Sequence, residues 1–198
     1  MKITIVFANI LFVAVALILW EIYEHFRHLT RRSKIKKVIH VNGTRGKSSV
    51  TRLICFALKE AGFKVIAKTT GAIAQVISTD GTIDAILRLG KANIGEQVGL
   101  FKRAVQEGAD TVVVECMAVD PQFQKVSEEK IIQSDLGVIT NVRDDHKEIM
   151  GPSKAEIAES LCNTIPRGKV VFTAETEQFD IIKKNALKKN AKVFLSDA

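Results

Sequence analysis

The sequence predicts an α/β protein in which an N-terminal transmembrane helix precedes a doubly wound parallel sheet with a phosphate-binding loop. Three observations support this fold: an uncharged apolar run at residues 3–20, alternating strand and helix patterns from residue 38 onward, and the glycine loop GTRGKS at residues 43–48. Strands that alternate with helices form parallel sheets with helices on both faces. The 198 residues suffice for roughly one such domain and an appendage.

The apolar run is long enough to cross a membrane. As a helix, its 18 residues would measure about 27 Å, close to the hydrocarbon thickness of a bilayer. Trp20 and Tyr23 stand where interfacial aromatic residues are expected, and basic residues follow them directly. By the positive-inside rule, the rest of the chain is expected in the cytoplasm. The predicted location is therefore the cell membrane, with a single pass.

Alternatives remain open around this segment. A cleaved signal peptide would use the small residues 14–16 (AVA), and a buried core helix would need cover on all sides from a small domain. We expect a transmembrane anchor over residues 1–23 and a basic juxtamembrane linker over residues 24–37. Residues 21–37 contain neither Gly nor Pro, so they equally suit a continuation of the helix.

Charge and cysteine content exclude some partners. Much of the net charge of +7 lies in two clusters, at residues 27–37 and 183–192, so no spread-out nucleic-acid surface and no nucleic-acid partner are expected. Cys55, Cys116 and Cys162 are far apart, without a Cys-x-x-Cys pair or zinc-type histidine spacing. They are typical of reduced thiols in a cytosolic domain.

Residues 38–198 are expected to form one domain of alternating elements. The run TVVV at residues 111–114 suits a strand buried on both faces, and residues 69–93 are expected to be loop with short strands. The remaining strands are expected at residues 38–41, 64–67, 136–140, 169–172 and 192–195, and the helices at residues 50–61, 94–106, 156–164 and 179–189.

The glycine loop has the residues that phosphate binding needs. Glycines let backbone N–H groups point inward, a lysine reaches the terminal phosphates, a hydroxyl holds magnesium, and a helix begins behind them. Gly43, Gly46, Lys47 and Ser48 meet these needs between a strand and a helix. The full Walker pattern would have a glycine at Val41, so the match is to a shorter form, and a plain helix-capping turn is the alternative.

Further polar residues follow later strands. Ligands bind outside the carboxyl ends of parallel strands, where Glu115 follows one strand and Asn141, Asp144, Asp145 and His146 follow the next. Hard oxygen ligands and an imidazole would meet there beside the glycine loop and could hold magnesium. The alternatives are a buried structural acid for Glu115 and a surface or helix-capping histidine for His146.

These residues resemble a known family. The glycine loop, Glu115, residues 140–142 (TNV) and the group Asp145, His146 and Gly151 are similar to the ATP-binding domain of Mur-type ligases and folylpolyglutamate synthases. Over essentially the whole predicted cytosolic part, the chain resembles more closely the poly-γ-glutamate synthase subunits of PgsB/CapB type. The segments that carry this likeness are NGTRGKSSVTR (42–52), KTTG (68–71), NIGEQ (93–97), ECMAVD (115–120) and residues 145–152.

The resemblance implies a P-loop, Mur-ligase-central-like domain and an ATP-dependent amide ligase. ATP would convert a carboxylate into an acyl phosphate, which the amino group of the next glutamate attacks, so that γ-glutamyl bonds form in capsule-type poly-γ-glutamate synthesis. The implied cofactors are ATP and Mg²⁺. The implied partners are glutamate, the growing poly-γ-glutamate chain and other membrane subunits of a synthesis and export complex. Relatives continue with a second α/β domain, which we expect this chain to lack.

The resemblance also assigns roles to residues. Lys47, Glu115 and His146 would be catalytic, and Ser48, Glu115 and His146 would hold metal. The nucleotide would contact Gly43, Thr44, Arg45, Gly46, Lys47, Ser48, Ser49 and Asn141. Mur ligases often use a carbamoylated lysine as a further ligand, but the helix after Gly151 has no lysine in the stretch AEIAESL. The alternative function is a truncated, non-catalytic ATP-binding or assembly subunit of such a membrane complex.

Overall fold

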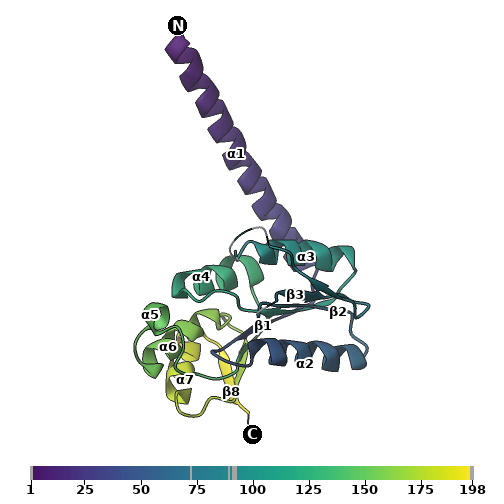
Figure 1. The fold of residues 1–198 in the computed structure, drawn as a ribbon, viewed down its shortest axis with the longest axis vertical. Coiled ribbons are helices and arrows are strands. Elements are labelled where there is room, and N and C mark those ends of the chain that lie inside the picture. Colours follow the sequence, from purple (N-terminus) through teal and green to yellow (C-terminus); the bar gives the residue numbers. More distant parts are fainter. Residues whose placement is uncertain (1, 72, 89, 91–92, 197–198) are drawn as a thin grey trace.

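The structure is a computed structural model, and it describes residues 2–71, 73–88, 90 and 93–196. A long helix, α1 (Lys2–Ser33), projects from a domain in which helices pack on both faces of a sheet (Figure 1). Met1 and residues 197–198, which the predicted anchor and domain include, lie outside the described residues. The described part agrees with the predicted fold class.

The strands form one sheet in the order β4-β3-β2-β5-β1-β6-β7-β8. The doubly wound parallel arrangement is confirmed from β2 to β8. At the other edge, β3 runs antiparallel to both of its neighbours, β2 and β4. The turn STDGT (78–82) joins β3 directly to β4, whereas a parallel pair would need a longer crossover. The strands are β1 (Lys37–Asn42), β2 (Val65–Thr69), β3 (Gln75–Ile77), β4 (Ile83–Ala85), β5 (Thr111–Glu115), β6 (Leu136–Ile139), β7 (Val170–Thr173) and β8 (Lys192–Leu195).

Helices cover the two faces unequally. In Figure 1, α2 lies on one face, and α3 and α4 lie on the other. The helices after α1 are α2 (Lys47–Glu60), α3 (Glu96–Gln106), α4 (Pro121–Val126), the π-helix η1 (Ser127–Ile132), α5 (Lys147–Met150), α6 (Lys154–Leu161), the 3₁₀-helix η2 (Cys162–Thr164) and α7 (Phe179–Lys188). The predicted helices are present, whereas α4, η1 and α5 were not predicted.

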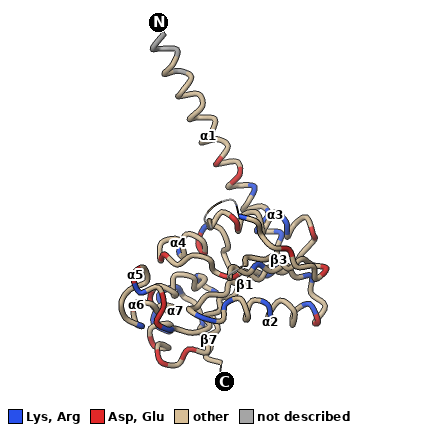
Figure 2. Tube along the Cα trace, viewed as in Figure 1, with Lys and Arg blue, Asp and Glu red and all other residues tan. Residues whose placement is uncertain are grey.

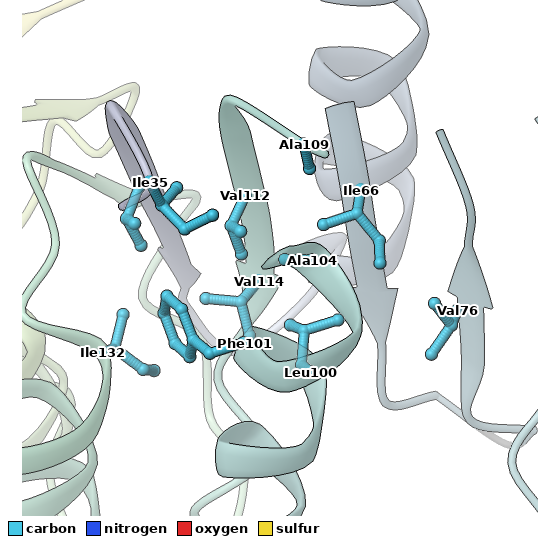
Figure 3. Packing of buried hydrophobic residues seen from close by; sticks show 11 residues of the cluster. Ile35, Ile66, Val76, Leu100, Phe101, Ala104, Ala109, Val112, Val114 and Ile132 are labelled. Atoms are coloured by element: carbon cyan, nitrogen blue, oxygen red, sulfur yellow. The ribbon is translucent and has the colours of Figure 1, made fainter. Parts of the chain in front are cut away.

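The largest buried cluster lies between the sheet and α3. Side chains of the central strands, such as Val112 and Val114, pack against Leu100 and Phe101 of the helix (Figure 3). The β-branched run predicted to be a central strand is fully buried. Burial of a Leu or Phe side chain contributes roughly 1.5–3 kcal/mol, so this cluster holds α3 firmly on the sheet. The sheet is thereby a rigid base for the loops at its carboxyl edge.

One half of the α2 face is uncovered in the part of the chain that the structure describes. There, Phe172 of β7 and Phe194 of β8 stack with ring centroids 5.3 Å apart, although 38% and 47% of their surfaces are exposed. Two cavities of about 510 Å³ each lie along this surface, and one of them reaches Arg45 and Gly46 of the glycine loop. Contiguous exposed apolar surface of this kind is typical of an interaction site.

Helix α1 continues without a break through most of the predicted linker. Its described side chains between residues 6 and 23 are exposed, and residues 9–33 contain a stretch long and apolar enough to cross a membrane. After Lys2, the charged residues of α1 begin at Glu21, on the side of the helix toward the domain (Figure 2). Within the last turns His28 is buried, with its ring 5.3 Å from that of Phe101. The predicted linker is therefore largely helical, as the open alternative had it, and its last turns pack on the domain.

Candidate active site

The glycine loop follows β1 and leads directly into α2. Gly43 has a φ of 135° and Gly46 a φ of 79°, and L side chains rarely adopt either value. A Cβ atom on Gly43 would also lie 2.0 Å from the Thr140 hydroxyl oxygen. Only glycine fits at residue 43, because the backbone there passes directly against β6.

The start of α2 presents free backbone donors to this loop. Gly46 is the N-cap residue, no side chain caps the helix, and its first turn has no acidic residue. Such a helix end attracts anions through its unpaired N–H groups and its dipole. Lys47 Nζ donates to the Gly43 carbonyl at 2.8 Å, so the ammonium group lies over the loop.

Glu115 joins the loop to two strands. Its side chain is 3% exposed at the end of β5, and its Oε2 atom accepts hydrogen bonds from Ser48 Oγ at 2.8 Å and from the Thr70 backbone N–H at 2.7 Å. The predicted neighbours Ser48 and Glu115 are thus in direct contact. The alternative of a structural acid paired with lysine is not what the structure has, since both hydrogen-bond donors here are neutral.

Asn141 binds the glycine loop through both ends of its amide. Its Oδ1 atom accepts from Thr44 Oγ1 at 2.8 Å and from Arg45 N at 3.1 Å, and its Nδ2 atom donates to the Arg45 carbonyl at 3.1 Å. Thr140 Oγ1 donates to the same carbonyl at 2.7 Å. Asn141 therefore fixes the outer half of the loop against β6.

His146 reaches the same site from the loop after β6. It has a φ of 46°, its side chain is about half exposed, and it lines the cavity that the glycine loop borders. Asp145 pairs with Arg45 at 3.3 Å, and Asp144 pairs with Lys147 at 3.1 Å. Of these polar residues, His146 alone lines the cavity.

A cavity of about 190 Å³ collects five of the ten predicted site residues, whereas Arg45, Gly46 and Asn141 line the cavity on the uncovered side of the sheet. Gly43, Thr44, Lys47, Glu115 and His146 line it, whereas Ser49 is exposed beside it. Ser48 borders the site through its hydrogen bond to Glu115. The complete lining is Asn42, Gly43, Thr44, Lys47, Thr70, Gly71, Glu115, Cys116, Met117, Ala118, Val119, His146 and Met150.

The oxygen donors present fit a magnesium ion. Mg²⁺ in phosphate-binding sites uses one or two protein oxygens together with phosphate oxygens and water. Ser48 and Glu115 provide a hydroxyl and a carboxylate in contact at the mouth of the loop. Among the described residues, no three His, Cys, Asp or Glu side chains form a group that could hold a metal on its own. The site therefore suits a cation that arrives with phosphate.

A charged cluster beside the cavity was not predicted. Lys68, buried on β2, lies 3.0 Å from Glu96, and Arg88 donates to Glu96 at 2.8 and 3.0 Å. Burial lowers the pKa of Lys68, and Glu96 acts in the opposite direction. Burial alone would raise the pKa of Glu96, but Arg88 and Lys68 lower it to about 2. The signals in the sequence were a lysine within an apolar strand run and the presence of Lys68 and Glu96 in two segments that carry the family resemblance, KTTG (68–71) and NIGEQ (93–97).

Beneath the glycine loop lies a second unpredicted group, the buried pair of His40 and Glu128. His40 Nδ1 is 2.7 Å from Glu128 Oε2, and both side chains are almost inaccessible to solvent. Burial alone would lower the pKa of His40, but the side chains of Cys116 and Glu128 outweigh it and raise the pKa to about 9. His40 is therefore protonated at neutral pH.

The His40 pKa predicts a loss of stability at alkaline pH. The contribution of protonated His40 to the free energy of unfolding is complete below pH 6.5 and is lost as the pH rises through about 9. We expect the free energy of unfolding to fall by roughly 3 kcal/mol across this window. Urea unfolding in detergent micelles at several pH values measures this. The His40→Gln variant should lose this slope and the exposed His25→Gln control should keep it; equal slopes in all three proteins would contradict the assignment.

Comparisons with known proteins agree with this geometry. Residues 41–197 match the family model of the Mur ligase middle domain. The chain is 40% identical over 185 residues to the capsule biosynthesis protein CapB of Bacillus anthracis, covering 92% of this chain and 40% of that protein. It is 38% identical over 191 residues to the PGA synthase CapB of Bacillus subtilis, covering 95% of this chain and 49% of that protein.

Solved structures share the fold. E. coli FolC in complex with ADP superposes with a TM-score of 0.62 at 18% identity, covering 85% of this chain and 44% of that one. The present chain thus spans about half the length of the relatives it matches. Since the family model matches residues 41–197, well over half of the chain, the chain belongs to the Mur ligase family and contains its middle domain.

Proposed function

We propose that this chain is the ATP-binding part of an amide ligase that forms γ-glutamyl bonds in poly-γ-glutamate synthesis. The observation that carries the proposal is the contact of Ser48 with Glu115 at the mouth of the glycine loop. It combines an anion-binding helix end with a pair of hard oxygen ligands. The likeness to a capsule biosynthesis protein and a PGA synthase supports glutamate as the substrate.

Each site residue would then have a defined task. Backbone N–H groups of residues 43–49 would bind the ATP phosphates, and Lys47 would neutralise charge on the phosphate that is transferred. Ser48 and Glu115 would hold Mg²⁺, which supplies charge neutralisation when bound. His146, which also lines the cavity, would be a ligand for a second ion shared with Glu115. Asn141 would act by holding the loop.

The reaction would have two balanced steps. A carboxylate oxygen of glutamate attacks the terminal phosphorus of ATP, and the bond from this phosphorus to the bridging oxygen breaks, giving an acyl phosphate and ADP. The amino nitrogen of the next glutamate then attacks the acyl carbon, the bond from that carbon to the phosphate oxygen breaks, and the amine loses a proton. A γ-linked amide and phosphate are the products.

The exposed apolar part of α1 supports a location in the cell membrane, with the domain in the cytoplasm. The domain would then work beside the membrane on glutamate and the growing polymer. One helix cannot provide a path for an anionic polymer, because every polar group must be satisfied within the bilayer. Other membrane subunits of a synthesis and export complex would therefore be partners.

A second candidate function is a non-catalytic ATP-binding or assembly subunit. It is favoured by the exposed, stacked rings of Phe172 and Phe194, which leave apolar surface of the sheet uncovered among the described residues. The uncovered apolar surface on β7 and β8 would be the place where a further polypeptide packs, and its cavity extends to Arg45 and Gly46. In this case the domain would bind ATP, and ligation would depend on the partner.

Trapping the acyl phosphate distinguishes the two candidates. Membranes that contain the chain and its synthesis complex are incubated with ATP, Mg²⁺, glutamate and hydroxylamine, which converts an acyl phosphate into a stable hydroxamate. The ligase proposal expects ADP formation that depends on glutamate, together with glutamyl hydroxamate. ATP binding without glutamate-stimulated ADP formation in the complete complex would reject it in favour of the assembly subunit.

A further inference from the structure

The unpredicted α4–η1 segment, residues 121–132, extends from the glycine loop to the end of α1. Asp120 caps its start by accepting from the Gln122 and Phe123 backbone N–H groups. Its second half is a π-helix, a form that is rare and often occurs at functional sites. Two of its side chains, Gln124 and Glu128, are buried and point to β1 immediately before the glycine loop.

Gln124 fixes the first residue of the loop. Asn42 Nδ2 donates to Gln124 Oε1 at 3.0 Å and to Thr164 Oγ1 at 3.1 Å. These two bonds orient the amide so that Asn42 Oδ1 accepts from the Gly43 N–H at 2.8 Å. Gln124 is itself held, since its Nε2 atom donates to the Val119 carbonyl at 3.0 Å.

One helical turn further along, Glu128 fixes the middle of β1. It binds His40 through Oε2, and its Oε1 atom accepts from both the backbone N–H and the hydroxyl of Ser134 at 2.9 Å. A buried carboxylate with three donors has little freedom to move. The α4–η1 segment therefore holds β1 at two points, His40 and Asn42.

The far end of the segment is held by α1. The last carbonyls of a helix have no partners within it and attract cationic donors. Arg32 donates to the Ile132 carbonyl at 2.8 Å and to the Gln133 carbonyl at 2.6 Å, and His28 Nε2 donates to the Ile131 carbonyl at 2.7 Å. The membrane-proximal helix thus caps the π-helix directly.

We propose that the end of α1 positions the glycine loop through the α4–η1 segment, with Arg32, Gln124 and Glu128 as positioning residues. The inference rests on the proposed function only for the identity of the nucleotide. None of the three is among the residues that line the cavity, so each would act through Asn42 or His40. Loss of the Arg32 contacts would free the end of the segment and let the loop lose its binding geometry.

The test measures nucleotide binding and the protection of the glycine loop from hydrogen exchange. Both are measured on the full chain in detergent micelles. The variants are Arg32→Gln, the shape-conserving Gln124→Met and their double variant. The matched control is Arg31→Gln, because Arg31 pairs with Glu24 of its own helix. The probe is a non-hydrolysable ATP analogue with Mg²⁺, and hydrogen exchange at the Gly43 amide reports on the loop without nucleotide.

Both single variants are expected to weaken analogue binding about tenfold and to speed exchange at Gly43. Exchange at Val113, in the central strand, should stay unchanged and shows that the domain is folded. The double variant should bind no more weakly than the weaker-binding single variant. Wild-type affinity and exchange in Arg32→Gln, or additive losses in the double variant, would overturn the inference. Failure of the wild type to bind the analogue would reject the proposed function, and Gly43 exchange would still decide the inference.

Discussion

Replacing Lys47 by alanine is expected to slow glutamate-dependent ADP formation by about 10²- to 10³-fold. The reason is electrostatic: Lys47 Nζ lies over the loop, 2.8 Å from the Gly43 carbonyl, and it is the one fixed positive charge among the described residues that line the cavity. Charge on the transferred phosphate would then be stabilised only by the metal and the backbone. The loss should appear mainly in kcat, which steady-state assays of the membrane complex measure.

Lys64→Ala is the matched control for this variant. Lys64 is exposed before β2 and does not line the cavity, so its replacement removes the same charge without touching the loop. Its turnover should equal that of the wild type. Wild-type rates of γ-linked polymer synthesis in Lys47→Ala membranes would show that the phosphate assignment is wrong.

Most of the fold was predictable because its strands have strong local signals. The run at residues 111–114 is β-branched throughout and is fully buried in the structure, as predicted. The helix–strand alternation likewise predicted a parallel sheet, which β2 and β5 to β8 with β1 form. The α4–η1 segment was missed, although Asp120 followed by Pro121 is a typical helix start. Its π-helical half depends on long-range contacts such as Glu128 to His40, which no local pattern contains.

Ligands bind outside the carboxyl ends of parallel strands, and this rule predicted part of the site but not all of it. That rule predicted that Lys47, Glu115 and His146 would meet, and all three line one cavity. It could not predict that a backbone N–H of Thr70 would bind Glu115, because backbone donors have no residue signature. The contacts of Asn141 with the loop likewise follow from the approach of β6 to Gly43, which only the folded chain defines.

Replacing Glu115 by glutamine should remove most of the magnesium dependence of ATP binding and lower turnover by about 10²-fold. The change keeps the shape and one oxygen acceptor at the end of β5, and because Ser48 and Thr70 both donate to Oε2, an amide oxygen at that position accepts from both. It removes the only carboxylate among the described residues that line the cavity. Calorimetric titration with ATP at increasing Mg²⁺ concentration measures the effect, and the exposed Glu60→Gln, at the far end of α2, is the control.

The same variant separates a metal ligand from a structural acid. A purely structural Glu115 would stabilise the contact between α2 and β5 only through its neutral donors, and Glu115→Gln would then leave the Mg²⁺ dependence of ATP affinity as in the wild type. A metal ligand gives a weaker Mg²⁺ dependence at an unchanged urea midpoint, since glutamine preserves hydrogen bonding but not the negative charge that attracts Mg²⁺. The slope of ATP affinity against Mg²⁺ concentration, compared with the urea midpoint of the same preparation, therefore decides between the two roles of this one side chain.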